Sequence, residues 1–192
     1  MPTSTPKTPE ELLTDIRRIA PEFVQVRRQI HAHPELAFEE VETSNLVAGK
    51  LVEWGYEVER GIAGTGLVGQ LRRGRSERRL GLRADMDALP IIERTGLPYS
   101  STVHGKMHAC GHDGHTAILL CAAKYLARHG QFNGTLNLIF QPAEENEGGA
   151  LRMVDEGLFD RYPCDSIYAL HNAPGLPVGQ MAMSAGPAMA SF

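Results

Sequence analysis

The chain has 192 residues, of which 42% are hydrophobic and 22% charged, and its formal net charge at pH 7 is −4. This size and composition are typical of one globular domain. The negative net charge gives no electrostatic basis for a nucleic-acid partner or an anionic membrane partner. No apolar run approaches the length of a transmembrane helix, and the polar residues 1–9 do not resemble a signal peptide. Three cysteines, an odd number, argue against a disulfide framework and for a reducing compartment, by default the cytoplasm.

Two helices are predicted near the N-terminus. Residues 8–11 (Thr-Pro-Glu-Glu) form a capping-box pattern, and apolar residues at helical spacing follow it. Pro21 should kink or divide this first helix. The helix closes with His31 and His33, whose position favours an interaction with the negative end of the helix dipole over metal ligation. A second helix is predicted over residues 39–54, just before a glycine.

Strands and further helices follow in alternation. The arginine-rich segment 72–79 is interpreted as a solvated, hairpin-like turn between two strands rather than an anion site. The predicted strands are residues 56–58, 67–71, 79–84, 135–140 and 165–170. Later helices are predicted over residues 113–129, with Asp113 as N-cap, and 148–156. The alternation indicates an α/β fold with helices packed on a mixed, mainly parallel sheet.

Residues 107–115 read Met-His-Ala-Cys-Gly-His-Asp-Gly-His and concentrate metal-ligand types at the start of a predicted helix. Thiolate, imidazole and carboxylate groups suit zinc and its transition-metal neighbours. Cys110 and His112 are two residues apart, so their side chains are able to face the same way. The alternative is a loop with a buried cysteine and solvated histidines. It is disfavoured because further ligand types follow two later strands, at Glu144, Glu145 and His171.

Acidic residues follow two of the predicted strands. Asp85 and Asp87 leave the strand at 79–84, where sheet-based enzymes keep their chemistry, although an Asx-type turn before a proline is an equal alternative. Glu144 and Glu145 leave the next strand. In a loop, one of the two is able to ligate a metal while its neighbour takes a proton from water that the metal has made more acidic. The alternative for this pair is surface charge.

Several stretches resemble the amidohydrolases of the hippurate hydrolase group, within the aminoacylase superfamily of metallopeptidases. The resemblance is carried by residues 82–90 (LRADMDALP), 107–113 (MHACGHD), 140–145 (FQPAEE) and 170–171 (LH), with residues 27–36 and 185–191 also matching. It therefore covers nearly the whole chain. It implies a zinc-aminopeptidase-like catalytic domain, here incomplete.

The resemblance also implies a site for two divalent metal ions, which zinc, manganese, cobalt or nickel would fill. The implied ligands are Cys110, His112, Glu145 and His171. Glu144 would be the general base. Asp87, the other catalytic candidate, matches an acid that lies behind a ligating histidine two residues earlier in many members of the superfamily. Here that earlier position is an aspartate. The implied reaction is hydrolysis of a small N-acyl amino acid, such as a hippurate-like substrate, to a carboxylate and a free amino acid.

Members of this group are longer than this chain. The resemblance implies that residues 1–192 form the N-terminal part of the catalytic metallohydrolase domain. A lid or dimerisation domain, which would support a homodimer, and the C-terminal part of the catalytic domain would be absent. A further metal-ligating histidine and an oxyanion-stabilising histidine come from those parts, so the 192-residue piece alone is expected to be inactive.

Two other classes of function stay open at this point. One is a protein that keeps the metal site but does not turn over substrate. The other is a thiol hydrolase with Cys110 as nucleophile and His112 as base. The two-residue spacing makes that pairing awkward, because nucleophile and base must lie within hydrogen-bond reach.

Overall fold

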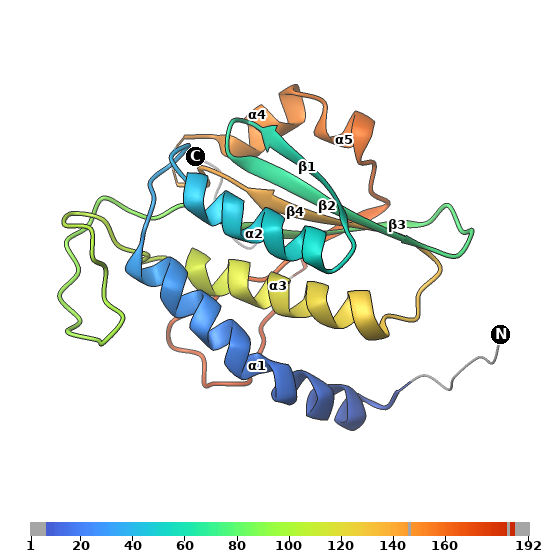
Figure 1. The fold of residues 1–192 in the computed structure, drawn as a ribbon, viewed down its shortest axis with the longest axis horizontal. Helices are drawn as coiled ribbons and strands as arrows, with labels where there is room; N and C mark the ends of the chain where they lie inside the picture. Colours follow the sequence, from blue (N-terminus) through green and yellow to red (C-terminus); the bar gives the residue numbers. More distant parts are fainter. Residues whose placement is uncertain (1–6, 146, 184, 187–192) are drawn as a thin grey trace.

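The computed structural model describes residues 7–145, 147–183 and 185–186. Within them, helices cover both faces of a five-stranded sheet (Figure 1). This confirms the predicted α/β class. The helices are α1 (Pro9–Ala32), α2 (Val41–Glu53), α3 (His112–His129), α4 (Gly149–Asp155) and α5 (Leu158–Arg161). The strands are β1 (Glu57–Ile62), β2 (Gly66–Arg73), β3 (Arg79–Asp85), β4 (Gly134–Gln141) and β5 (Ser166–Ala169).

The strand order in the sheet is β1-β2-β4-β3-β5. Strand β3 pairs in parallel with β4 and β5, whereas β2 is antiparallel to β1 and β4. The sheet is therefore mixed, as predicted. Because β4 lies between β2 and β3, the arginine-rich segment crosses the end of β4, and the prediction of a hairpin-like turn was wrong. A strand inserted from a later part of the chain leaves no signal in the local sequence.

The first helix begins as the sequence predicts. The Thr8 side chain accepts the Glu11 N–H, and the Glu11 side chain accepts the Thr8 N–H in return. Pro21 does not divide the helix, which is continuous to Ala32. Pro21 lies on the exposed side of the helix, where the carbonyl group left without an N–H partner is accessible to water.

The start of α3 differs from the prediction. Its N-cap is Gly111, in a left-handed conformation with φ of 95°, and the prediction of Asp113 as N-cap was wrong. Asp113 is fully buried and pairs instead with α1, through Arg27 Nε at 2.6 Å and His31 Nδ1 at 2.8 Å. The buried His31 also lies 3.2 Å from Glu93 Oε1. His31 lies in the last turn of α1, as the helix-dipole prediction requires, and it is in addition a buried link between elements. Partners far apart in sequence override the local capping preference.

The hydrophobic core has two layers because β4 is buried on both faces. On one side, α1, α2 and α3 pack against residues such as Leu67 and Phe140 (Figure 1). On the other side, α4 and α5 cover the alternate residues Val68 and Ile139. This two-sided burial fixes the register of the central strands, since a shift by one residue would exchange the two faces.

The parallel arrangement determines where the polar segments that follow the strands lie. Strands β3, β4 and β5 run in the same direction, so their carboxyl ends meet at one edge of the sheet. The segments that follow them carry Asp87, Glu144, Glu145 and His171. The first turn of α3, with Asp113 and Thr116, packs at the same edge, where the Thr116 hydroxyl donates to the Asp85 carbonyl. No helix in the described residues is both long and apolar enough to cross a membrane.

We predict that Gly149→Ala destabilises the fold. A Cβ at Gly149 would overlap the Pro142 carbonyl oxygen, so the backbone of the turn after β4 would have to move. The expected loss is about 1–3 kcal/mol in the free energy of unfolding, as for other overpacked sites. Urea denaturation measures it. Gly49→Ala in α2 is the matched control, because a Cβ there meets nothing within 4 Å. It should stabilise the protein by about 0.5–1 kcal/mol. Equal stability of the two variants would contradict the close contact.

Candidate metal centre

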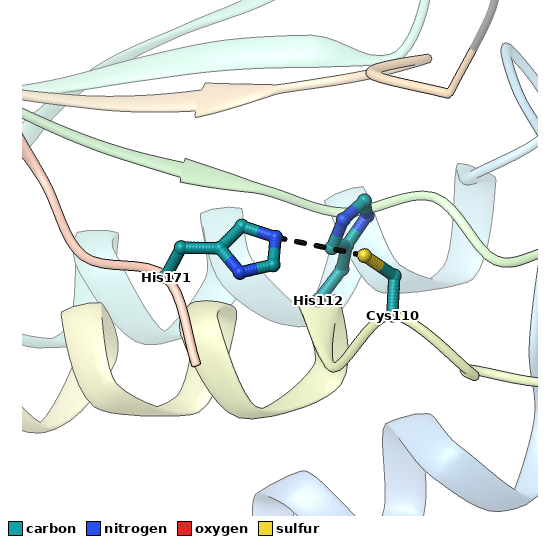
Figure 2. Close-up of side chains that lie close together, drawn as sticks. All are labelled: Cys110, His112 and His171. Atoms are coloured by element: carbon teal, nitrogen blue, oxygen red, sulfur yellow. Dashed lines mark hydrogen bonds between the residues drawn. The ribbon is translucent and has the colours of Figure 1, made fainter. Parts of the chain in front are cut away.

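Three strand exits and the start of α3 bring ligand-type side chains together. Ligand atoms of Cys110, His112 and His171 lie within 4.8 Å of one another. Figure 2 shows the Cys110 thiol facing the His171 ring, with Sγ 3.5 Å from Nε2. Ligand atoms of His112, Glu144 and Glu145 meet the same 4.8 Å limit. The structure therefore places the other three candidate ligands and the candidate base around the imidazole of His112.

The His112 ring is fully buried and has one unsatisfied nitrogen. Its Nδ1 lies 3.1 Å from Asp87 Oδ1, and since a carboxylate only accepts, Nδ1–H donates. Its Nε2 has no hydrogen-bond partner. Burial lowers the pKa of His112, but the Asp87 hydrogen bond and the neighbouring carboxylates outweigh burial and raise it.

Carboxylate oxygens surround this nitrogen at distances too long for hydrogen bonds. His112 Nε2 lies 3.8 Å from Glu144 Oε2 and 3.9 Å from Glu145 Oε1. Asp85 Oδ2 is 3.7 Å away. A buried nitrogen lone pair, a thiol and several carboxylates around one point are the donors that a divalent transition-metal ion accepts. The residues present therefore fit a metal site.

Asp87 connects two of the candidate ligands. It is 1% exposed, and its Oδ2 accepts the Glu145 backbone N–H at 2.9 Å while its Oδ1 contacts His112. Burial raises the pKa of Asp87, but hydrogen bonds from His112 and from the backbone of Glu145 and Glu144 lower it overall. This geometry favours a role in positioning His112 and Glu145 over direct proton transfer to substrate.

Two hydrogen bonds of Ala143 fix the turn that carries Glu144 and Glu145. Ala143 adopts a left-handed φ of 51°, and its N–H donates to Oε1 of the buried Glu40 at 2.8 Å. The Gly149 N–H donates to the Ala143 carbonyl at 2.9 Å. This tight turn directs both glutamate side chains toward His112, which an extended backbone would not allow. Glu40 was missed in the sequence, where it is one of several acids in a helical segment.

The environment of Cys110 is acidic. Burial and the hydrogen bond with Glu145 raise the pKa of its thiol to about 12. The imidazole beside it is that of His171, which follows β5 in an exposed segment. His171 Nδ1 lies 2.7 Å from the Asn172 carbonyl oxygen, so Nδ1–H donates to it. In a neutral ring the lone pair of His171 is then on Nε2, facing Cys110.

The contact between Asp85 and His115 was also missed in the sequence. Asp85 lies 2.7 Å from both Arg83 Nη1 and His115 Nδ1. Burial raises the pKa of Asp85, but the His115 hydrogen bond and the charge of Arg83 outweigh burial and bring it to about 2. His115 follows His112 by three residues on α3, and this i, i+3 spacing places both on one helix face. That spacing was the available signal.

Comparison with known proteins identifies the family. The model of "Peptidase family M20/M25/M40" matches residues 81–187, more than half of the chain, and this stretch contains every candidate site residue. The chain belongs to this peptidase family. The sequence resemblance to the hippurate hydrolase group also included residues 185–191. Residues 187–191 of that stretch lie outside the residues that the structure describes.

The M20 chain is 55% identical over 163 residues to hippurate hydrolase of Campylobacter jejuni, across 85% of this chain and 42% of the relative. It is 43% identical over 186 residues to thermostable carboxypeptidase 1 of Saccharolobus solfataricus. This match covers 95% of this chain and 47% of the relative. The chain thus spans less than half the length of these relatives. The solved structure of the Bacillus subtilis YXEP protein, described as a dinuclear metal binding peptidase from the M20 family, matches with a TM-score of 0.78 at 40% identity. That match covers 85% of this chain and 45% of the other.

We predict that Asp87→Ala weakens zinc or cobalt binding about 10–100-fold, the usual effect of removing a group that orients a ligating histidine. The His112 ring and the turn with Glu145 lose their shared acceptor in this variant. Competition with a chromophoric chelator measures the affinity. Asp155→Asn, at an exposed position of α4, is the control and should bind as the parent does. Parent-like affinity of Asp87→Ala would show that Asp87 does not organise the site.

Proposed function

We propose that this M20-family chain forms a large part of the active site of a metal-dependent amidohydrolase acting on small N-acyl amino acids. The observation that carries this proposal is the unpartnered, buried His112 Nε2, which faces Cys110, Glu144 and Glu145. The similarity to hippurate hydrolase supports the substrate class, since hippurate is the N-benzoyl derivative of glycine. A carboxypeptidase, as in the second relative, also releases a free amino acid from an amide bond.

The proposed metal ligands are Cys110, His112, Glu145 and His171. Zinc, manganese, cobalt and nickel all accept this mixture of sulfur, nitrogen and oxygen donors. A pair of ions is proposed because a related M20 structure is described as dinuclear. Bound divalent cations would polarise the substrate carbonyl and make a nearby water more acidic.

The two glutamates differ in ways that suit different roles. The Glu145 backbone N–H is fixed by Asp87, and its side chain interacts with the Cys110 thiol, as expected for a ligand. The Glu144 side chain is more exposed, at 39% against 24%, so it is more accessible to water and substrate. We assign Glu144 as the general base, which takes a proton from the attacking water and returns it to the leaving amine.

The proposal extends to the whole protein. Residues 1–192 correspond to the N-terminal part of a catalytic metallohydrolase domain, with the rest of that domain, a lid and a homodimer contact supplied by further chain. The shares of 42% and 47% of the two relatives support this. We place the protein in the cytoplasm because its three cysteines are free and do not form a disulfide framework.

The thiol hydrolase fits this site less well. The Cys110 thiol contacts the His171 imidazole and makes no hydrogen bond with its proposed base, His112. Burial and Glu145 raise the pKa of that thiol, so little thiolate forms without a cation. A protein that binds metal without catalysis would have the same site geometry as the amidohydrolase. A measurement of turnover distinguishes these two functions.

We predict that Glu144→Gln, in the full-length protein, keeps metal content but lowers kcat by at least about 100-fold, because the amide cannot accept the water proton. Hydrolysis of N-benzoyl- and N-acetyl-amino acids with added manganese or zinc measures kcat. Glu147→Gln is the matched control, since Glu147 is an exposed acid of the same segment, and should leave kcat unchanged. A Glu144→Gln enzyme within a few-fold of the parent would place the base elsewhere. A metal-loaded parent without turnover would favour the non-catalytic alternative.

A further inference from the structure

We propose that His115 is a positioning residue that fixes His171 for metal ligation through the backbone of Asn172. This inference rests on the proposed function, because it requires that His171 ligates a metal. It concerns a side chain outside the four proposed ligands and the proposed base.

The starting point is the exposed position of His171. Within the described residues β5 lies at the edge of the sheet, and His171 lies in the irregular segment that follows it. Residues 170–172 form neither a helix nor a strand. A ligand on such a segment needs contacts of its own to hold its ring toward Cys110, because the sheet does not supply them.

The Asn172 backbone supplies one of these contacts. Its carbonyl oxygen lies 2.7 Å from His171 Nδ1 and accepts the ring N–H, which leaves Nε2 to face the metal centre. Ligating histidines commonly donate their second ring N–H to such an acceptor. The orientation of the His171 ring therefore depends on where the Asn172 peptide lies.

His115 holds that residue in place. The Asn172 N–H donates to His115 Nε2 at 3.1 Å. The other ring nitrogen, Nδ1, donates to Asp85, which in turn pairs with Arg83. His115 is 4% exposed. A buried chain of contacts thus runs from β3 through α3 to the segment that carries His171.

Packing reinforces the same contact. The rings of His115 and His171 lie 4.5 Å apart, centroid to centroid, at an angle of 60°. A Cβ at Gly111 would overlap the Asn172 side chain. Gly111 lies between Cys110 and His112, and the absence of a side chain there leaves room for the Asn172 side chain. His115 and Gly111 together bring the β5 exit onto the start of α3.

Cobalt(II) titration of the chain tests this proposal with a double-mutant cycle of His115→Ala, His171→Ala and the double variant. We expect His115→Ala alone to weaken cobalt binding about 10–100-fold. In the His171→Ala background the same change should alter affinity by less than about twofold, because His115 acts through His171. At saturating cobalt, His115→Ala should keep the sulfur-to-cobalt charge-transfer band of Cys110.

A conservative variant tests the hydrogen bonds. His115→Gln has an N–H donor for Asp85 and an oxygen that accepts the Asn172 N–H, so it should recover most of the affinity. His104→Ala, at an exposed loop position, is the control and should bind as the parent does. Thermal unfolding with a chelator present checks that each variant folds. Should His115→Ala fail to fold, His115→Phe, which keeps the ring volume, replaces it in the cycle.

Two results would overturn this proposal while leaving the proposed metal site in place. If His115→Ala lowers the cobalt affinity equally in the parent and in the His171→Ala background, His115 acts independently of His171. Binding by His115→Gln as weak as by His115→Ala would show that these hydrogen bonds are not the cause. A parent chain that binds no cobalt would instead overturn the proposed metal site, and this positioning role with it.

Discussion

The Asp87 carboxylate accepts a hydrogen bond from the His112 ring on one oxygen and from the Glu145 backbone on the other. It lies just past the end of β3, whereas its two partners belong to α3 and to the turn after β4. One buried group thereby fixes three segments relative to one another. It also sets the His112 tautomer, so that the Nε2 lone pair faces the carboxylates and the thiol. The site we propose depends on this arrangement.

Electrostatics explain why such an arrangement calls for a cation. Asp85, Glu144 and Glu145 each bring a carboxylate oxygen within 4 Å of the fully buried His112 Nε2. Like charges gathered around one point repel one another, and a positive charge among them relieves that repulsion. Arg83 pairs with Asp85, but among the described residues no Lys or Arg ion pair involves Glu144 or Glu145. A divalent ion held by these side chains would supply the missing positive charge.

The sequence was sufficient to predict most of the element order and the class of the fold. Periodicity and caps are local, so the start of α1 and the strand of 79–84 could be predicted from neighbouring residues. The ligand candidates were also visible, because strand exits of a parallel sheet meet at one edge. The position of β4 between β2 and β3 was not visible, since pairing between distant strands leaves no local pattern.

The supporting residues were harder to predict than the ligands. Glu40 contacts Ala143 across more than 100 positions of sequence, and Asp113 leaves its expected capping role to pair with α1. His115 and Asn172 are 57 positions apart. The residues next to each of these side chains in the sequence do not indicate a distant partner. Only the folded chain shows which distant partner it contacts.

Anomalous diffraction from crystals of the zinc-loaded protein tests whether His112 Nε2 and Cys110 Sγ ligate a metal ion. We predict an anomalous peak at the zinc edge within about 2.0–2.3 Å of both His112 Nε2 and Cys110 Sγ, the usual lengths of zinc–nitrogen and zinc–sulfur bonds. His112 Nδ1 should remain bonded to Asp87. A fully loaded crystal with its zinc away from His112 Nε2 would show that this nitrogen is not a metal ligand.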